Sequence, residues 1–535
     1  MQPVAPPGKT PAHTMRLLFC YGLPALGFAM LFATVPQQYG TVEDVFLLYG
    51  LSGGFQQAPT ELLHYNHILN PVLGWPLMKL FQVAPQVNWY TVLLFAVQYF
   101  SNCIVAWCLL RRNTMLQAAL FFLVFFFVFE SAFFAVINFT NSALLLGMAS
   151  ILHFTLGEVD RRWQAGKGAM LYSAASLLRI HVLLPLLPLA APYLLTSTTR
   201  RAVLRRAAWM VLALLVIAAL HKIQEVHYER NIPGWKREEQ YRQMAYLFYN
   251  HQNKKRVDSA SPDYFIYRVI NQKPVFDTNL VKPEAMAQRF QTVRRAGFRT
   301  SRTIMGWFFV NNRIYFLSIL VTLLFLRSRR DFLRLGTSML IALTMWLALQ
   351  YEYGKFPDYL LLSALGFPML LALSTRSNVA QPQKRSWALI VLVLLSAWGL
   401  WIRYKQGKGQ SAQALEFLAG YDDIAHHPET LFYIGLVRYP LFAYPVWQAP
   451  TRHPMGNVLY SEHFLNRLDG PARVKFGLRS FADIPQHQNV LLAGWEESDI
   501  KNYFNHIYST PVALDSIKSD FKYFRPFRVR LLPKQ

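Results

Sequence analysis

The sequence predicts an all-α bundle that crosses a membrane many times, followed by a small C-terminal α/β domain outside the cytoplasm. The chain of 535 residues is 53% hydrophobic and only 16% charged. Apolar runs of the length that spans a bilayer recur along it, which indicates about ten to twelve transmembrane helices when a pair of short broken helices is included. These runs stop near residue 402. The tail 403–535 alternates strand-like segments (Thr430–Val437 and Asn489–Ala493) with helix-like segments (Ser411–Leu418 and Glu496–His506).

Ten apolar runs carry this prediction. Several are shorter than the roughly 20 residues of a full span, but each is bounded by charged or turn-forming residues. The runs are Leu17–Val35, Trp89–Leu110, Met115–Val136, Ser142–Leu156, Met170–Leu195, Ala207–Leu220, Ile314–Leu326, Met339–Leu349, Tyr359–Leu373 and Trp387–Trp401.

The net charge of +25 is a topology signal rather than the signature of a nucleic-acid partner. Its basic residues cluster at alternate ends of the apolar runs, and short loops rich in Lys and Arg stay in the cytoplasm. This places residues 1–14 in the cytoplasm, the loops 36–88 and 221–305 outside, and the tail 403–535 outside as well. The transmembrane domain then covers residues 15–402, and the chain is a multi-pass protein embedded in the lipid bilayer.

The run Met170–Leu195 is predicted to break in the middle. Arg179 and His181 lie near its centre, and three prolines follow. A single crossing would put every later basic cluster on the wrong side of the membrane, whereas two short helices that enter and leave on one side keep them all inside. Charged residues and broken helices occur where they face a cavity rather than lipid.

All three cysteines, Cys20, Cys103 and Cys108, lie inside apolar runs. They are expected to be small core residues, with no disulfide framework. Together with the lack of an organelle retention signal, this favours a bacterial inner membrane.

Glu43 and Asp44 are the first candidates for chemistry, because charges directly after the first apolar run are costly so near lipid. A carboxylate there can deprotonate an acceptor hydroxyl. It can also hold a divalent cation such as Mg or Mn that neutralises a phosphate at the membrane surface, and Asp44 is the candidate metal ligand. The alternative is a helix start, where acids are stabilised by the positive end of the helix dipole.

The segment that follows, up to Tyr90, is half apolar and half polar, which predicts interfacial helices on the outer face of the membrane. His64, Asn66 and His67 in this segment are candidates for an acceptor or sugar site. Two histidines alone have no specific metal signature, so hydrogen-bonding or structural roles stay open.

Arg179 is the main candidate for binding a phosphate, because a guanidinium group binds phosphate in a planar fork and keeps its charge. The alternative is an intramembrane ion pair with Glu130 that fixes helix packing. His181 is a candidate for orienting the acceptor or is a satisfied core residue. Lys355 and Lys222 are candidates for further phosphate contacts, the alternative being that their side chains only snorkel to the interface.

Four motifs occur in a recognisable order: the acidic pair, a glycine turn at 50–54, Pro59-x4-His64-x-x-His67-Ile-Leu, and then Asn88-Trp-Tyr. This order resembles bacterial multi-pass proteins of the GT-C glycosyltransferase superfamily. Further echoes are the turn 138–143, the basic residue Arg179 within paired short helices, and the polar helix entry 355–358. The resemblance covers roughly residues 15–400. Members often begin the first loop with Asn-Asp-Asp, so Asp44 matches the pattern better than Glu43.

The resemblance implies an integral membrane glycosyltransferase. Its donor would be a sugar linked to polyprenyl phosphate, and its acceptor a glycan, lipid or protein on the extracytoplasmic face. Asp44, together with Glu43, would act as base or metal ligand, and Arg179 would hold the donor phosphate. The tail would cover the site or choose the acceptor.

Three other functions remain open. A transporter or flippase of lipid-linked glycans would carry intramembrane charges spread through its helices, whereas here they cluster at one membrane face. A polysaccharide polymerase would need room for two lipid-linked chains. A non-catalytic scaffold would work through its tail and would not need Asp44.

Overall fold

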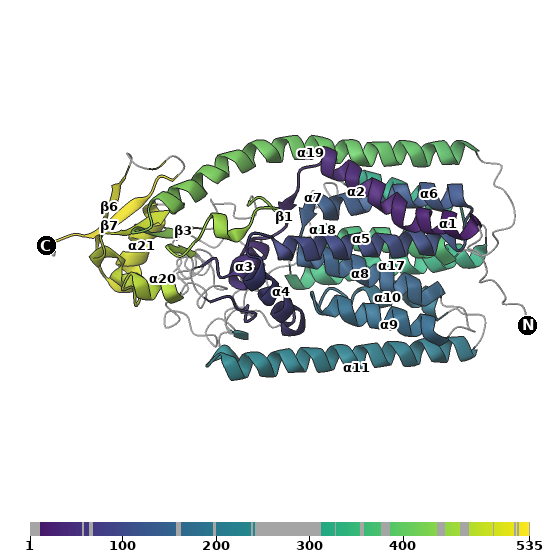
Figure 1. The fold of residues 1–535 in the computed structure, drawn as a ribbon, viewed down its shortest axis with the longest axis horizontal. Coiled ribbons are helices and arrows are strands. Elements are labelled where there is room, and N and C mark those ends of the chain that lie inside the picture. Colours follow the sequence, from purple (N-terminus) through teal and green to yellow (C-terminus); the bar gives the residue numbers. More distant parts are fainter. Residues whose placement is uncertain are drawn as a thin grey trace, which may run out of the picture.

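The structure is a computed structural model that describes a long helical bundle with a small sheet domain at one end (Figure 1). His64, Asn66, His67, Lys355 and most of the predicted outer loop 221–305 lie outside the residues it describes. The described residues are 11–55, 58–63, 68–156, 162–195, 200–236, 239–240, 312–326, 328–353, 358–375, 386–435, 444–460, 470–495, 497–517, 521 and 524–533.

Every predicted apolar run contains helix, which confirms a polytopic helical membrane fold. Within the described residues, six helices are long and apolar enough to cross a membrane, and three shorter apolar helices accompany them. The bundle helices are α1 (Pro11–Leu17), α2 (Leu23–Thr34), α5 (Trp89–Leu110), α6 (Met115–Val124), α7 (Ser131–Ala135), α8 (Phe139–Leu156), α9 (Arg162–Ser176), α10 (Leu186–Leu194), α11 (Arg200–Asn231), α16 (Arg313–Leu323), α17 (Arg329–Tyr353), α18 (Asp358–Thr375) and α19 (Ser386–His426).

Two of the spans contain a short π-helical stretch. Leu18–Gly22 joins α1 to α2, and Phe125–Glu130 joins α6 to α7. A π-turn widens the helix by one residue and occurs frequently at functional sites. The second stretch ends on Glu130, whose side chain is fully buried in the bundle.

The predicted break in the run Met170–Leu195 is present, because the chain leaves helix after α9 and re-enters it at α10. Leu69 N and Asn70 N, which lie within the first loop, donate to the carbonyls of Leu178 and Leu177 at 2.9 and 2.7 Å. The C-terminal half of α11 reaches the same place, since Asn70 Nδ2 donates to Leu220 O at 3.1 Å. The bend therefore lies at the end of the bundle where α11 finishes, as the hairpin prediction requires.

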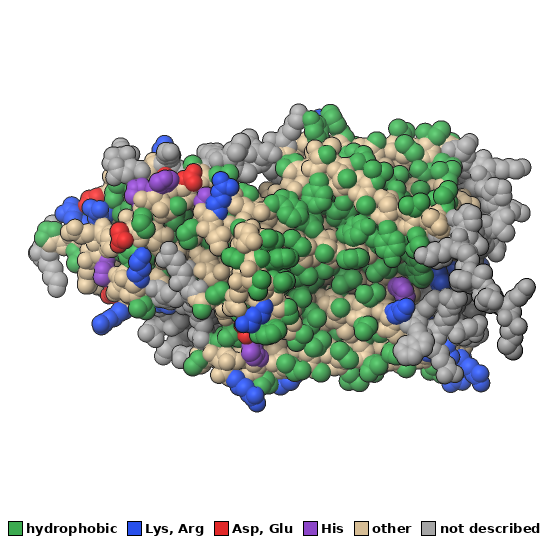
Figure 2. Space-filling model, viewed as in Figure 1, with side chains coloured by type: hydrophobic (Ala, Val, Ile, Leu, Met, Phe, Trp, Pro, Cys, Tyr) green, Lys and Arg blue, Asp and Glu red, His purple; other side chains and the backbone are tan. Residues whose placement is uncertain are grey.

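The outside of the bundle is apolar, as lipid contact demands. Figure 2 shows hydrophobic side chains covering most of the bundle on this face, while charged side chains gather mainly over the sheet domain. Helix α11 runs along one side of the bundle and α19 along the opposite side, and α1 and the sheet domain lie at opposite ends of the molecule (Figure 1).

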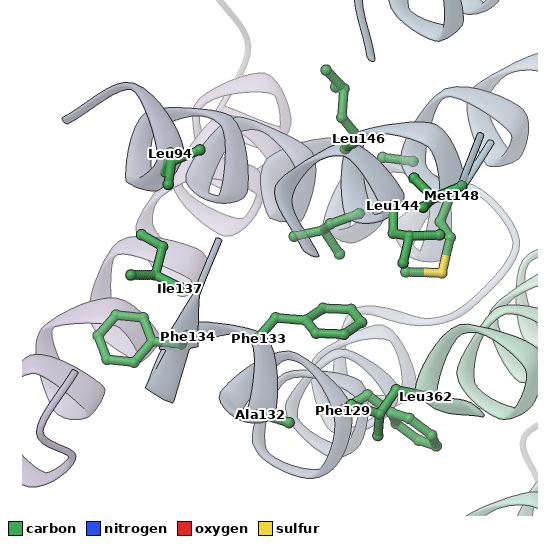
Figure 3. Close-up of a cluster of buried hydrophobic side chains, with 14 of the residues drawn as sticks. Leu94, Phe129, Ala132, Phe133, Phe134, Ile137, Leu144, Leu146, Met148 and Leu362 are labelled. Atoms are coloured by element: carbon green, nitrogen blue, oxygen red, sulfur yellow. The ribbon is translucent and has the colours of Figure 1, made fainter. Parts of the chain in front are cut away.

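The interior of the bundle is a continuous aromatic and aliphatic core. Figure 3 shows Phe133 and Phe134 of α7 near Leu94 of α5, Leu144 of α8 and Leu362 of α18, all of them buried. Close packing of this kind fixes the relative positions of the four helices. The start of α8 and the start of α5, which matter for the site, are therefore held on a rigid base.

A short two-stranded sheet leads the chain from the first span to the acidic pair. β1 (Gln38–Tyr39) runs parallel to β2 (Val136–Ile137), and Gly40 N donates to Ile137 O at 2.8 Å. A Cβ at Gly40 would lie 2.1 Å from Asn138 Nδ2, so any larger residue would have to displace the Asn138 side chain. The pairing brings residues 41–44 against the start of α8.

The two helices of the first loop differ from each other. α4 (Pro71–Val83) exposes the large apolar side chains Val72, Trp75 and Val83, in agreement with an interfacial helix. α3 (Val42–Ser52), which carries the acidic pair and precedes the predicted interfacial segment, is buried from Asp44 to Leu51. The tail packs on α3, because Tyr49 Oη donates a hydrogen bond to His453 O, and this contact removes the helix from solvent.

The tail contains a five-stranded mixed sheet. Its strand order is β4-β3-β5-β7-β6, with β3 parallel to β4 and β5, and with β7 antiparallel to β5 and β6. Two helices, α20 (Gly470–Lys475) and α21 (Glu497–Tyr508), accompany the sheet. The strands are β3 (Leu431–Ile434), β4 (Val458–Tyr460), β5 (Val490–Ala493), β6 (Val512–Ser516) and β7 (Phe527–Leu531).

The small α/β domain is therefore confirmed, with one change at its beginning. The predicted separate helix at 411–418 is part of α19, which continues without a break from Ser386 to His426. The helix crosses the boundary predicted at residue 402 because backbone hydrogen bonding continues after the apolar sequence ends. The bundle and the sheet domain thus share one continuous helix.

Candidate functional site

Asp44 lies in the first turn of α3, where the local sequence forms a capping box. Thr41 is the N-cap residue, and Asp44 Oδ2 accepts hydrogen bonds from Thr41 N at 3.0 Å and Thr41 Oγ1 at 2.8 Å. Its other oxygen, Oδ1, accepts from Tyr90 Oη at 2.7 Å and from Phe139 N at 3.3 Å. One carboxyl group therefore joins the starts of α3, α5 and α8.

The Asp44 side chain is fully buried. Burial raises the pKa of its carboxyl to about 7, while the hydrogen bonds from Tyr90 and Thr41 act in the opposite direction. Both oxygens already have two donors each. This geometry leaves Asp44 no free lone pair aimed at an acceptor or a metal ion, which is at odds with the base or metal-ligand role inferred for it above.

Glu43 is the accessible member of the acidic pair, since its side chain is half-buried rather than buried. It occupies the same first turn of α3, where the helix dipole stabilises a negative charge. Its charge acts on the hydroxyls of both Tyr90 and Tyr359. Glu43 thus lies within electrostatic range of the starts of α5 and α18.

Arg179 lies in the bend between α9 and α10 and is half-buried. Its guanidinium donates to Thr140 Oγ1 and lies over the rings of Phe139 at 5.3 Å and Tyr359 at 6.0 Å. Its Nε is buried and has no hydrogen-bond partner. The guanidinium is therefore positioned by one hydrogen bond and two aromatic faces, and it retains an unused donor.

The acidic pair and the arginine belong to one site. Phe139 donates its backbone N–H to Asp44 and places its ring beside Arg179. Tyr359 is within electrostatic range of both Glu43 and Arg179. The first loop, the turn before α8 and the bend between α9 and α10 therefore contribute residues to one site.

The alternative interpretation of Arg179 is wrong, because no ion pair joins it to Glu130 among the residues that the structure describes. Both carboxyl oxygens of Glu130 are buried without a hydrogen-bond partner. Glu130 ends the π-helical stretch between α6 and α7, whereas Arg179 lies at the bend between α9 and α10. No described acid neutralises the guanidinium.

The remaining candidates lie farther from this centre or outside the described ranges. His181 is exposed, and its ring lies 6.4 Å from that of His221 on α11. Lys222 has a side chain that is 68% exposed and pairs with Glu225, three residues further along α11. We therefore leave Lys222 out of the site. His64, Asn66, His67 and Lys355 are outside the described residues.

Three residues of the site were missed in the sequence. Thr41 could have been found, because Thr41-Val-Glu-Asp44 fits the pattern of a capping box. Tyr90 belongs to the Asn88-Trp-Tyr motif, and Tyr359 directly follows the polar helix entry 355–358, but neither pattern indicates a role in the site. Their roles depend on contacts between helices that are far apart in the sequence.

The described residues do not fit a protein-bound divalent cation. No group of three His, Cys, Asp or Glu side chains comes together in the part of the chain that the structure covers. Glu43 is the single acid of the pair with a free carboxylate, and a Mg²⁺ site uses several oxygen ligands. We derive no catalytic step through a metal.

Two solved structures are similar to this chain over almost its whole length. One is ArnT from Cupriavidus metallidurans bound to undecaprenyl phosphate, with 12% identity, a TM-score of 0.49 and coverage of 97% of this chain and 98% of that one. The other is the same protein in the apo state, with 12% identity, a TM-score of 0.43 and the same coverage. No family model matches the chain, and no curated protein matches it significantly.

The two acids are expected to differ in their contribution to stability. In the wild type the carboxylate of Asp44 accepts hydrogen bonds from these donors, whereas in Asp44→Asn an amide N–H would face some of them. Each buried polar group left unsatisfied lowers the free energy of unfolding by about 1–3 kcal/mol. Thermal melts of the detergent-solubilised protein should show a drop of several degrees for Asp44→Asn. Glu43→Gln removes the same charge from the neighbouring, half-exposed position and should have the same melting temperature as the wild type. Equal melting temperatures for the two variants would contradict the network described above.

Proposed function

We propose that the protein is a glycosyltransferase that moves a sugar from a polyprenyl-phosphate carrier to an acceptor on the extracytoplasmic face of a bacterial inner membrane. One observation carries the proposal: Arg179, a half-buried guanidinium with an unused donor, faces no described counter-ion and shares Tyr359 with a half-buried acid. A donor phosphate at the membrane surface supplies the missing negative charge. The resemblance to GT-C glycosyltransferases in the sequence supports the same reaction.

In this proposal the role of each charged residue follows from how accessible its side chain is. Arg179 binds the phosphate, because a guanidinium in a desolvated position gains more from an anion than one in water. Glu43 removes the proton from the acceptor hydroxyl as that oxygen attacks the anomeric carbon, and the bond from the sugar to the phosphate oxygen breaks. Asp44 holds α3, α5 and α8 together so that Glu43 is correctly placed. The choice of a glycan, lipid or protein acceptor is left to the loops and the tail.

The site lies at the end of the bundle where α11 finishes and the tail begins. With the N-terminus in the cytoplasm, this end faces away from the cytoplasm. A lipid-linked donor can enter from the bilayer with its phosphate at the interface. Arg179, at a bend near the ends of the apolar helices, is at the depth where such a headgroup lies.

The test is turnover by the purified wild-type protein. It is incubated in detergent with a panel of polyprenyl-phosphate sugars and candidate acceptors, and released polyprenyl phosphate is measured. We expect release with at least one sugar, accompanied by transfer of that sugar. Failure across all donors, in a preparation with a cooperative melt, would argue against a transferase.

A flippase of lipid-linked glycans is the second candidate, and one observation favours it. Glu130 is a fully buried carboxyl inside the apolar bundle, next to Asn102. Acids inside a membrane mark transport pathways in many transporters. In reconstituted vesicles a flippase would move the labelled donor across the bilayer without releasing its sugar.

A further inference from the structure

The tail makes a specific contact with the bundle through the connection between β3 and β4. We call residues 444–455 the docking segment. Val446 O accepts hydrogen bonds from Thr91 Oγ1 at 2.6 Å, Asn88 Nδ2 at 2.8 Å and Tyr39 Oη at 3.3 Å. Three donors on one buried carbonyl make this a precise attachment point.

The attachment falls on the first turn of α5. Asn88 is the N-cap of this helix, because its Oδ1 accepts from Thr91 N at 3.1 Å. Its Nδ2 also donates to Tyr39 Oη at 2.8 Å and to Gln448 O at 3.2 Å. The cap of α5 is therefore built partly from the tail.

The same turn of α5 carries Tyr90, which donates to Asp44 at 2.7 Å. Trp447 of the docking segment stacks on Phe95, with the ring centroids 5.0 Å apart and the planes 11° apart. Phe95 lies further along α5. The tail therefore contacts this helix twice, once at its first turn through Asn88 and Thr91 and once beyond that turn through Phe95. Tyr90 cannot shift along the helix axis while these contacts hold.

The docking segment also holds the far end of α3. Tyr49 Oη donates to His453 O at 2.7 Å, and Met455 N donates to Gly54 O at 2.8 Å. α3 is thus fixed at its start by Asp44 and at its end by the tail. Both helices that meet at the acidic pair are clamped by the same twelve residues of chain.

We propose that the docking segment of the tail positions the acidic pair, and that Asn88 and Thr91 are the positioning residues that transmit this effect to Glu43 through Tyr90 and Asp44. The consequence for turnover rests on the proposed function, whereas the consequence for local order does not. Undocking the segment frees the first turn of α5 and loosens the hydrogen bonds on Asp44. The acid moves, while the phosphate site at Arg179, which has no described contact with the docking segment, stays in place.

The chain offers matched variants for the test. Thr91→Val removes the hydroxyl that donates to Val446 O and keeps the shape, and Thr91→Ser restores a hydroxyl. Trp447→Ala removes the stacking on Phe95 from a side chain that is 50% exposed, so it should not disturb folding. Trp401→Ala is its control, because Trp401 is 52% exposed and stacks on Tyr404 within α19, away from the docking segment.

Two readouts are measured on the full-length protein. The first is hydrogen exchange at the amides of Thr41 and Phe139, which donate to Asp44. The second is steady-state kinetics, which gives kcat and the KM for the donor as separate values. We expect Thr91→Val and Trp447→Ala to speed exchange at these amides and to lower kcat about tenfold with donor KM unchanged, because a misplaced acid affects the chemical step. Thr91→Ser and Trp401→Ala should behave as wild type.

Unchanged exchange at Thr41 and Phe139 in both Thr91→Val and Trp447→Ala would overturn the proposal. So would an equal loss in the Trp401→Ala control, or a rise in donor KM with kcat preserved. If the wild type shows no turnover with any donor, the proposed function fails, and the exchange rates alone decide whether the tail orders the acidic pair.

Discussion

Arg179→Ala is expected to lower kcat/KM for the lipid-linked donor by about 100-fold, because a charge-assisted hydrogen bond to phosphate contributes up to about 3 kcal/mol. The guanidinium is held by Thr140 and by the rings of Phe139 and Tyr359. None of these contacts neutralises its charge, so the phosphate has no local competitor among the described residues. The loss should appear mainly in donor binding, measured as KM or by direct titration with polyprenyl phosphate.

Two further variants make this prediction specific. Arg179→Lys keeps the charge but loses the planar fork, so an intermediate loss is expected. Arg313→Ala is the control, because Arg313 is exposed and lies over Trp398 at 5.6 Å instead of at the site. Full activity in Arg179→Ala, or an equal loss in Arg313→Ala, would remove Arg179 from the donor site.

Glu43→Gln is expected to reduce kcat by about 10²–10⁴-fold with little change in donor KM, since general-base catalysis contributes rate enhancements of that size. Glutamine keeps the shape of the side chain but cannot accept the acceptor proton. The stability of the variant should match that of the wild type, because the half-exposed Glu43 makes none of the hydrogen bonds that hold Asp44. Steady-state kinetics and a thermal melt on the same preparation test both statements.

The control for Glu43→Gln is Glu225→Gln, which removes a carboxylate from the ion pair with Lys222 on the exposed face of α11. It should leave turnover unchanged. If Glu43→Gln is fully active while Asp44→Asn is inactive but melts normally, the catalytic assignment returns to Asp44, and the buried network has been misinterpreted.

The arrangement of helices was predictable because its signals are local. Apolar runs identify the spans, and the basic clusters between them require that the chain bend near Arg179, where the structure places the break between α9 and α10. The strands around Phe432 and Leu491 and the helix at 497–508 were likewise visible as short patterned segments. The continuity of α19 was not predictable, because the polar sequence after Trp401 is typical of a separate helix that follows a loop.

The division of roles within the acidic pair could not be predicted. Asp44 is buried by Tyr90 and Phe139, which are 46 and 95 residues away in the chain. The contact between Asn88 and Val446 joins residues 358 positions apart. Such pairings depend on tertiary packing, which has no local sequence signal. The presence of acids beside the membrane, in contrast, is visible in the sequence as charges next to an apolar run.

The most direct test of the central claim is to map where polyprenyl phosphate binds, since this needs no knowledge of the sugar or the acceptor. A polyprenyl phosphate with a photoreactive group next to the phosphate is crosslinked to the wild-type protein, and the labelled peptides are identified by mass spectrometry. We predict labels on the peptides around Phe139–Thr140, Arg179 and Tyr359, and a loss of labelling in Arg179→Ala. Labelling confined to the opposite end of the bundle, around the start of α17 at Arg329, would contradict the account.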